Sequence, residues 1–487
     1  MTDSDQSLNH EICRQHVYED LFSPQKEDRA QLSVGLEIEM LPLILSGADT
    51  PRPMPLYSSA DEPRSRLTLD QQLRDLAAKK AWTCLDDHKG FLLSLYLEGK
   101  AETLTFEPGG QLEFSSKPYQ SLTLCAQRVL EVQKDLNEQL STGSILLQTG
   151  INPWHSPEEI GLQVKKSRYK AMDQYFSQIS PFGRRMMRQT CSIQMSLDWG
   201  SSDGVMAQRY GAAQFLAPWG TALFANSPFL DGSHPNNVLS HRALSWRRLD
   251  GSRTGFLWGL AGLKPKGIEE KFASKAYWAE SYLQFALNAG VVFIERASFQ
   301  EGYTVPNRLL RFKDWMEHGY LGIQPTSQDF LTHLSLLFPE VRPKGHFMEL
   351  RSVDAQQSFL QFTPAAFYLG LLYDQKNLDL ISELLPSQLD VMSNRLEKAV
   401  FGLQDPVIHG QASRLLQMSL EGLERLPAGY VSADIRSSLE YFFESHTGQQ
   451  KTPADRLLSM VQGRSGAFPS LMDFENLQNE ANYGRKP

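Results

Sequence analysis

The feature that most constrains the fold is a run of ten residues in which polar and apolar side chains alternate. In TCSIQMSLDW, residues 190–199, the apolar positions are Cys191, Ile193, Met195, Leu197 and Trp199. Because successive side chains of a β-strand point to opposite faces, this pattern predicts a strand with one buried and one polar face. Parallel sheets are usually covered on both faces, so the alternation favours an antiparallel sheet.

Two further segments show the same alternation and carry charged residues. QLSVGLEIEMLPLIL, from residue 31, sets Glu37 and Glu39 on one face of a predicted strand. HFMELRS does the same for Glu349 and Arg351. Helices are predicted near 68–80 and over 118–141, and the chain reads as helical from about 364. Strands separated by helices in this way favour an α+β fold with a largely antiparallel sheet.

The stretch TFEPGGQLEFS, residues 105–115, predicts a β-hairpin with a three-residue Pro-Gly-Gly loop. If Glu107 pairs with Gln111 across the loop, then Glu107, Gln111 and Glu113 share one face. Glutamate is a poor strand former, so its repeated use needs a reason. The reason is either a solvated sheet face or a site that needs several carboxylates.

Acidic side chains therefore recur on the polar faces of the predicted strands, at Glu37, Glu39, Glu107, Glu113 and Glu349. Five carboxylates gathered in one site would repel one another strongly unless cations compensate them. Hard oxygen ligands suit Mg²⁺, which commonly accompanies the phosphates of ATP. The alternative is that these residues lie on separate solvated faces and never meet.

Composition limits the class of protein. The chain has 487 residues, 41% hydrophobic and 21% charged, which is ordinary for a globular protein that contains a large core. A net charge of -8 argues against a nucleic-acid partner. No apolar run of about 18 residues predicts a membrane span, and the polar N-terminus is unlike a signal peptide. A cytoplasmic location is the resulting expectation.

Standard catalytic motifs offer one competing interpretation. The sequence has neither a GxxxxGK[ST] phosphate loop nor an HExxH zinc helix. Residues 200–204, GSSDG, fit the GxSxG pattern of serine hydrolases, with Ser202 as the nucleophile. The strand before such a nucleophile is normally buried on both faces, whereas the strand here alternates. Ser201, Ser202 or Asp203 is better explained as the cap of the following helix.

Several segments resemble the glutamate–cysteine ligases of the plant and proteobacterial type. TLTFEPGGQLEFSSKP resembles that family's EPGGQ-E-S segment, and GLEIE resembles its G-x-E-x-E strand. Other segments match in the same order, namely RYKAM (168–172), MMRQTCSIQ (186–194), ALFANSPF (222–229), SRTGF (252–256), FPEVRPK (338–344) and MELRSVD (348–354). The resemblance runs from about residue 33 to 374, most of the chain.

The resemblance implies a fold and an activity. The fold is that of the glutamine synthetase catalytic domain, a curved, largely antiparallel sheet forming a cradle backed by helices. The expected organisation is an N-terminal helix and connector over 1–30, a catalytic ligase domain over 31–363, and a helical C-terminal region over 364–487. The activity is ATP-dependent joining of the γ-carboxylate of L-glutamate to the amine of L-cysteine through γ-glutamyl phosphate. A monomer or homodimer is expected.

The resemblance also implies roles for individual residues. The glutamates at 37, 39, 107, 113 and 349 are expected to hold Mg²⁺, with Gln194 beside them. The expected catalytic residues are Glu37, Glu107, Glu113 and Arg351. Candidates for contacts with ATP or a substrate carboxylate are Arg168, Lys170, Gln194, Arg253 and Arg351, and also Arg188 and Arg242. For Arg242 and Arg253 a structural ion pair is an equal alternative, and Lys170 could belong to a solvated helix face.

Three departures from the family pattern leave the acceptor amine open. Met40 follows the second glutamate of G-x-E-x-E, where plant members carry a basic residue. The segments 50–66 and 298–320 match poorly. A ligase of the same fold that uses another amine, or a homologue that binds nucleotide without catalysis, therefore remains an alternative.

Overall fold

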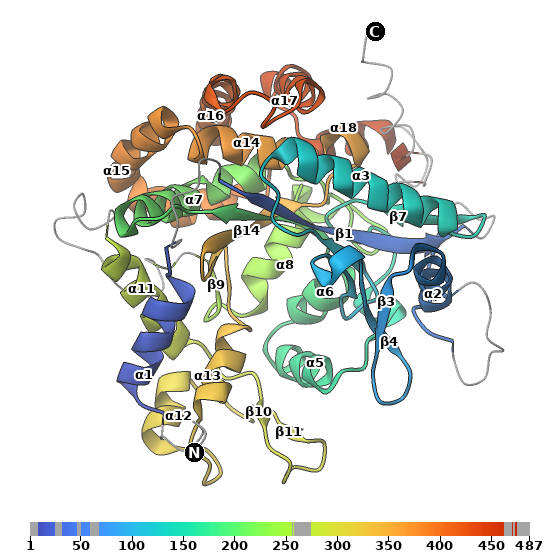
Figure 1. Ribbon diagram of the computed structural model, residues 1–487, viewed down its shortest axis with the longest axis vertical. Helices are drawn as coiled ribbons and strands as arrows, with labels where there is room; N and C mark the ends of the chain where they lie inside the picture. The colour runs from blue at the N-terminus through green and yellow to red at the C-terminus, as the bar shows by residue number, and fades with distance from the viewer. Residues whose placement is uncertain are drawn as a thin grey trace.

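The computed structural model describes residues 8–24, 32–45, 50–58, 68–255, 257, 274–461, 470 and 473–474. Within these residues the largest sheet has ten strands, and it crosses the middle of the molecule (Figure 1). Eight strands follow the order β13-β14-β8-β1-β6-β5-β4-β3. Their bounds are β1 (Val34–Ile44), β3 (Thr83–Asp86), β4 (Leu92–Tyr96), β5 (Thr103–Phe106), β6 (Leu112–Ser115), β8 (Ser192–Asp198), β13 (Val341–Lys344) and β14 (Phe347–Asp354).

All pairs in this sheet are antiparallel, including those that join β2 (Arg52–Pro53) and β7 (Ser144–Leu147) to one end of β1. The α+β class and the antiparallel sheet predicted from strand alternation are confirmed. The segment 50–66, which matches the family pattern poorly, is described only as far as residue 58.

The two helices predicted before residue 142 are both present, one with a later start. Helix α2 spans Leu69–Lys80 as expected. Helix α3 spans Leu122–Gln139, so it begins four residues after the predicted start at 118. The reason is that Tyr119 exchanges two main-chain hydrogen bonds of 2.9 Å with Val34, which extends the chain beside the sheet. Ser121 then caps the helix by accepting from the N–H of Leu124.

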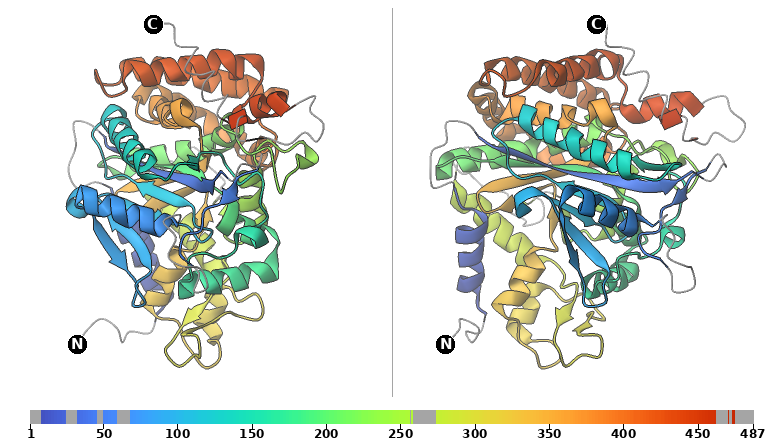
Figure 2. Two further views of the ribbon diagram at one scale, coloured as in Figure 1. Left: turned by 90° about the vertical axis from the view of Figure 1, so that its right-hand side faces the viewer. Right: turned by 45° about the vertical axis from the view of Figure 1, so that its right-hand side comes forward.

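Helices cover the apolar face of the sheet. Figures 1 and 2 show the C-terminal helices on one side of it together with α3 and α7. These helices are α7 (Asp203–Leu223), α14 (Thr363–Leu372), α15 (Gln375–Ala399), α16 (Pro406–Arg425), α17 (Ala433–Ser445) and α18 (Pro453–Val461). One cluster of buried side chains joins Leu36 and Ile193 of the sheet to Leu369. Because this core includes residues on both sides of residue 364, it does not mark a boundary there. The domain boundary at 364 stays a prediction.

The polar face of the sheet looks toward the other half of the molecule. Helices α5 (Ser167–Ile179), α6 (Phe182–Gln189) and α8 (His241–Leu249) lie on that side (Figure 1). To the left of them in Figure 1, α1 (His10–Gln15) contacts α11 (Lys275–Asn288) and α13 (Ser327–Leu334), with α12 (Phe312–His318) nearby. The expected N-terminal helix is thus present, whereas residues 1–7 and 25–31 lie outside the described residues.

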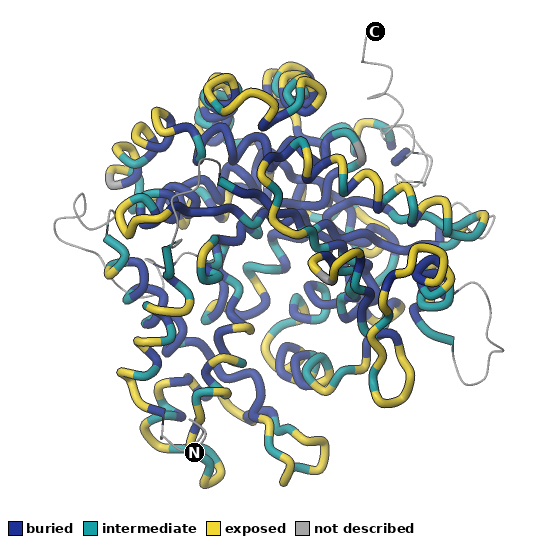
Figure 3. The backbone as a smooth tube through the Cα atoms, in the orientation of Figure 1, coloured by how far each residue is buried: buried dark blue, intermediate teal, exposed yellow. Residues whose placement is uncertain are grey.

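Burial follows this layering. The tube in Figure 3 is buried through the central strands and the inner sides of the helices, and exposed at the outer turns. None of the helices in the described part of the chain has the length and apolar character needed for a membrane span.

The Pro-Gly-Gly turn joins β5 to β6 and packs closely against the end of α6. The N–H of Glu107 donates to the carbonyl of Gln111 at 2.9 Å, and the N–H of Gly110 donates to the carbonyl of Glu107 at 2.8 Å. The predicted pairing of Glu107 with Gln111 is confirmed. Gly110 has a φ of 86°, which favours glycine. A Cβ added at Gly109 would lie 2.3 Å from the carbonyl oxygen of Arg188.

We expect Gly109→Ala to lower the free energy of unfolding by about 1–3 kcal/mol, because a main-chain atom has to move to admit the methyl group. Chemical denaturation monitored by circular dichroism measures this change. Gly204→Ala is the matched control, since a Cβ there meets no atom within 4 Å. The control should change the stability by at most about 1 kcal/mol. Equal stabilities for the two variants would contradict the close approach of the turn to α6.

Candidate active site

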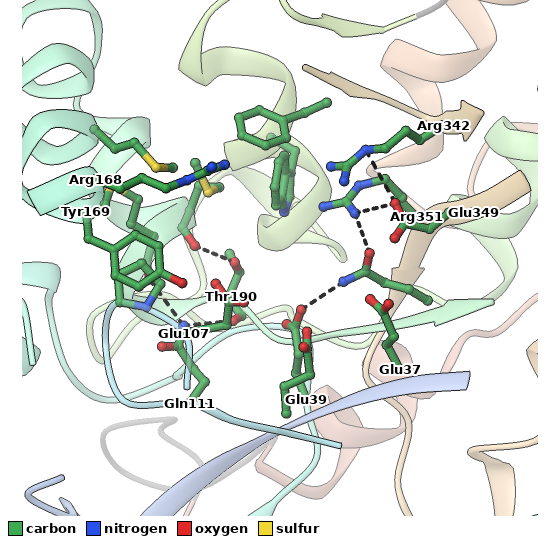
Figure 4. A pocket seen from close by; sticks show the side chains of 18 of the residues that line it. Glu37, Glu39, Glu107, Gln111, Arg168, Tyr169, Thr190, Arg342, Glu349 and Arg351 are labelled. Atoms are coloured by element: carbon green, nitrogen blue, oxygen red, sulfur yellow. Dashed lines mark hydrogen bonds and ion pairs between the residues drawn. The ribbon is translucent and has the colours of Figure 1, made fainter. Parts of the chain in front are cut away.

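The polar face of the sheet forms one wall of a cavity of about 320 Å³. The register explains how side chains from distant segments meet there. Across the ladders, Glu39 faces Glu113 and Glu37 faces Gln194, so these side chains point the same way. Figure 4 shows the result from close by. The sheet and its hairpin contribute Glu37, Glu39, Glu107, Gln111, Glu113, Gln194, Arg342, Lys344, Glu349 and Arg351.

All five predicted glutamates therefore line one cavity, and the alternative of separate solvated faces is wrong. Three of them form its acidic end. Glu39, Glu107 and Glu113 each offer a carboxylate oxygen, and these oxygens lie within 4.8 Å of one another. Oxygen ligands so placed suit a hard divalent cation such as Mg²⁺.

Hydrogen bonds hold two carboxylates of the acidic end in place. Glu39 accepts from the N–H of Ser192 at 2.7 Å and from its hydroxyl at 3.0 Å. The amide of Gln194 donates to the same carboxylate at 3.1 Å. Glu113 accepts from Thr105 at 2.9 Å and from Ser115 at 3.2 Å. The strands thus orient the carboxylates without any cation among their donors.

Burial and mutual repulsion make this acidic end costly to ionise. Burial, followed by repulsion from Glu349 and Glu113, raises the pKa of Glu37 to about 8. Burial and the charge of Glu39 raise the pKa of Glu113 to about 7. The pKa of Glu107 is raised well above its ordinary value for the same two reasons, burial first and Glu113 second. The acidic end therefore favours a bound cation.

The opposite end of the cavity is basic and is built around Glu349. The Glu349 carboxylate pairs with Lys344 at 2.6 Å, Arg351 at 2.8 Å and Arg342 at 3.4 Å. Burial alone would raise the pKa of Glu349, but these three cations outweigh it and hold the pKa well below its ordinary value. Arg351 also donates to the amide oxygen of Gln194. Three cations share one carboxylate, so this end can accept further negative charge.

Sequence analysis did not identify Arg342 and Lys344 as site residues. They are two residues apart in FPEVRPK, which is the spacing of one strand face. Arg342 lies directly opposite Glu349 on the β13–β14 ladder. The signal was present in the alternation of this segment, but the pairing of β13 with β14 was needed to interpret it.

The remaining wall of the cavity is largely apolar and comes from helices. Tyr169 and Met172 of α5, Met186 and Met187 of α6, Trp246 of α8, and Phe338 supply it. The rings of Trp246 and Phe338 meet edge to face at 5.1 Å between centroids. The guanidinium of Arg351 lies 5.4 Å from the centre of the Trp246 ring. The cavity therefore presents charged groups from the sheet and apolar groups from the helices to whatever it binds.

Of the two basic candidates on α5, the structure brings one to the cavity. Arg168 lines it and donates to the hydroxyl and carbonyl of Ser335 at 3.0 and 3.3 Å. Lys170 is exposed and does not line the cavity. Two residues along a helix correspond to about 200° of rotation, so the two side chains face opposite ways. The structure thus places Lys170 on the solvated face of α5, and its contact with ATP stays a prediction.

Three other arginines also form ion pairs or hydrogen bonds within the protein. Arg253 is fully buried and pairs with Asp250 at 2.7 Å, which is the structural ion pair given as its alternative, and its contact with ATP stays a prediction. Arg188 pairs with Asp173 at 2.5 Å and donates to a main-chain carbonyl. Arg242 donates to main-chain carbonyls of β14. None of the three is among the residues that line the 320 Å³ cavity.

Ser202 does not have the setting of a nucleophile. It is the N-cap of α7, where its hydroxyl accepts from the N–H of Val205 at 3.3 Å. Its side chain is exposed and lies outside the cavity. The serine hydrolase alternative is therefore wrong, and the capping interpretation is confirmed.

The fold and the site together define an α+β protein whose antiparallel sheet presents clustered carboxylates and guanidinium groups to one cavity. Comparison with known proteins identifies the family. The chain belongs to glutamate-cysteine ligase family 2, whose sequence pattern matches residues 34–473. The resemblance seen in the sequence motifs is thus confirmed, and the chain is a member of a ligase family.

Similar proteins include two plant enzymes and one bacterial structure. The chloroplastic glutamate–cysteine ligase of Brassica juncea is 32% identical, covering 76% of this chain and 68% of its own. That of Arabidopsis thaliana is 31% identical, covering 76% and 67%. The glutamate–cysteine ligase of Francisella tularensis, solved in complex with AMP, aligns with a TM-score of 0.52 at 12% identity, covering 95% and 91%. The last comparison supports the expected fold.

The plant relatives also correct one expectation. Their names place them in chloroplasts. The expected cytoplasmic location rested on the absence of a recognisable signal peptide, and the relatives contradict it. Location depends on targeting segments, which the residues of a catalytic site do not report.

We expect Glu107→Gln to raise the thermal unfolding midpoint of the metal-free protein by about 2 °C at pH 8, because the raised pKa means that ionised Glu107 opposes folding. The gain should shrink toward pH 4, where the carboxyl is protonated in the unfolded chain as well. Scanning calorimetry in a chelator measures it. Glu138→Gln, at an exposed glutamate, is the control and should leave the midpoint unchanged. A lower midpoint for Glu107→Gln at pH 8 would contradict the repulsion described above.

Proposed function

We propose that this chain catalyses the ATP-dependent ligation of the γ-carboxylate of L-glutamate to the amine of L-cysteine, which gives γ-glutamylcysteine. The observation that carries the proposal is the pairing of an acidic and a basic end in one cavity. Attack of a carboxylate on ATP brings two anions together, so both must be neutralised and aligned. Membership of the ligase family supports the same reaction.

The acidic end fits Mg²⁺. Glu39, Glu107 and Glu113 would hold the ion through their three neighbouring oxygens, with Glu37 and Gln194 beside them. Bound Mg²⁺ would supply positive charge that aligns the phosphates and offsets the repulsion between reactants. Glu349 could join these ligands only by releasing Lys344, with which it pairs at 2.6 Å. Its first role in this proposal is to hold the basic end together.

The basic end would bind the negative charge that the reaction moves. Arg342, Lys344 and Arg351 can exchange their shared carboxylate for phosphate oxygens or for the carboxylate of glutamate. Arginine suits such contacts because its planar guanidinium binds two oxygens at once. Arg168, at the α5 side of the cavity, would contact the far end of a bound substrate (Figure 4).

The apolar wall would protect the intermediate. γ-Glutamyl phosphate is an acyl donor that water would hydrolyse, so the reaction benefits from a wall that excludes water. Met186, Met187, Trp246 and Phe338 present such a surface to the same cavity as the carboxylates. The acceptor amine would approach along this wall and attack the acyl phosphate, losing a proton as it does so.

We propose that the enzyme works as a monomer or homodimer.

We expect release of ADP only when glutamate and cysteine are both present with Mg²⁺ and ATP. A coupled assay for ADP with glutamate and a panel of amino acids measures this. Cysteine should give the largest kcat/KM of the panel. ADP release with a different amine and none with cysteine would assign the chain to another ligase of the same fold. ATP binding without ADP release for every amine would indicate a homologue without catalysis.

We expect Glu113→Gln to lower kcat by ~100-fold or more, because a neutral amide removes one charge from the proposed cation site. The coupled assay gives kcat, and circular dichroism shows whether the variant is folded. Glu131→Gln, at a position with 65% side-chain exposure, is the control and should keep full activity. Near-normal turnover by folded Glu113→Gln would rule out the proposed cation site.

A further inference from the structure

One buried carboxylate outside the cavity has no role in the proposed mechanism, yet it joins two of the sequence motifs. Asp354 is the last residue of β14 and is 1% exposed. It ends the segment MELRSVD, and it contacts residues of ALFANSPF. Its Oδ2 accepts from the hydroxyl of Ser227 at 2.6 Å and from the N–H of Asn226 at 2.9 Å.

The other oxygen of Asp354 binds helix α8. Oδ1 accepts from the hydroxyl of Ser240 at 2.8 Å and lies 3.4 Å from Nε of Arg242. Ser240 is the N-cap of α8 and accepts in turn from the N–H of Ala243 at 3.1 Å. Both oxygens of the carboxylate are therefore occupied by donors, and the start of α8 is attached to the end of β14.

Arg242 extends this connection to an irregularity in β14. The register of β14 against β8 shifts between Leu350 and Val353, so Arg351 and Ser352 lie in a bulge. The guanidinium of Arg242 donates to the carbonyl of Val353, at 3.0 Å from Nη2, and to the carbonyl of Arg351. Arg242 thus supplies donors to carbonyls at both ends of the bulge. β-Bulges commonly serve to re-aim a side chain.

The bulge carries the side chain of Arg351, whose guanidinium lies between the sheet and the helix wall of the cavity. Arg351 contacts Gln194 and Glu349 on the sheet and lies over the ring of Trp246. Trp246 is four residues after Arg242, so both lie on the same face of α8. One helix therefore holds the main chain of Arg351 with its first turn and flanks the Arg351 side chain with its second.

We propose that Asp354 is a positioning residue of the ligase. It fixes α8 against the bulge, and so it directs Arg351 into the cavity although it does not touch the cavity itself. The inference rests on the proposed function, in which Arg351 binds phosphate or carboxylate. A carboxylate is required because it accepts from two hydroxyl groups and one N–H and forms an ion pair with one guanidinium, whereas an amide carries no charge and would present an NH₂ group to some of these donors.

The test is Asp354→Asn, alone and combined with Arg351→Ala. We expect Asp354→Asn to lower kcat/KM by roughly 10- to 100-fold, the loss that a displacement of about 1 Å in a catalytic group can cause. In the Arg351→Ala background the same substitution should change kcat/KM by no more than about twofold, because the group through which it acts is gone. Equal losses in both backgrounds would overturn the proposal.

A matched control separates positioning from a general loss of stability. Asp374 is also a buried aspartate that caps a helix and pairs with an arginine, but it lies among the C-terminal helices, at the N-cap of α15. Asp374→Asn should destabilise the protein without changing kcat or KM. If Asp354→Asn does not fold, Ser227→Ala removes one donor to Asp354 and should show a smaller loss that again disappears in the Arg351→Ala background.

A second readout does not depend on the reaction. A crystal structure of Asp354→Asn should show Arg351 displaced from Gln194 and Glu349, whereas in Asp374→Asn it should keep both contacts. Arg351 in an unchanged position in Asp354→Asn would overturn the proposal whether or not the chain is a ligase. Absence of ADP release by the unsubstituted chain would instead reject the proposed function and leave the structural result interpretable.

Discussion

The repulsion among clustered carboxylates on one face of the sheet is the constraint on which the rest of this structure depends. Glu39, Glu107 and Glu113 offer oxygens within 4.8 Å of one another, in a setting that disfavours ionisation. This unfavourable contribution to the free energy of folding must be offset by favourable contributions elsewhere in the fold. The sheet supplies these by burying a continuous apolar layer on its other face, where Leu36 and Ile193 join the main core. The acidic cluster and the core are thus two faces of the same strands.

The division of charge within the cavity follows from strand order. The hairpin and the centre of β1 provide the acidic end, while β13 and β14 at the edge of the sheet provide the basic end. Gln194 of β8 lies between the two ends and binds Glu39 on one side and Arg351 on the other. An uncharged side chain that both donates and accepts can join these groups without adding charge to either end.

Much of the fold and part of the site could be predicted from the sequence. Alternation in β1 and β8 indicated the polar sheet face, and the Pro-Gly-Gly loop indicated the pairing that aligns Glu107 with Glu113. The roles of the arginines could not be predicted in the same way. Arg253 is buried beside an aspartate three residues earlier, whereas Arg342 faces the cavity. Whether a guanidinium lies in the core or in a cavity depends on elements far away in the chain, and local pattern does not report it. The late start of α3 has the same origin, since main-chain hydrogen bonds with the distant Val34 keep Tyr119 extended.

The close approach of Gly109 to the main chain of Arg188 links two walls of the cavity. The turn belongs to the hairpin that bears Glu107 and Glu113, and Arg188 belongs to the helix that bears Met186 and Met187. Main-chain atoms of the turn and of α6 face each other directly, so no side-chain rotation can change the separation of these two segments. The width of the cavity between its carboxylates and its methionines is therefore a fixed dimension of the fold.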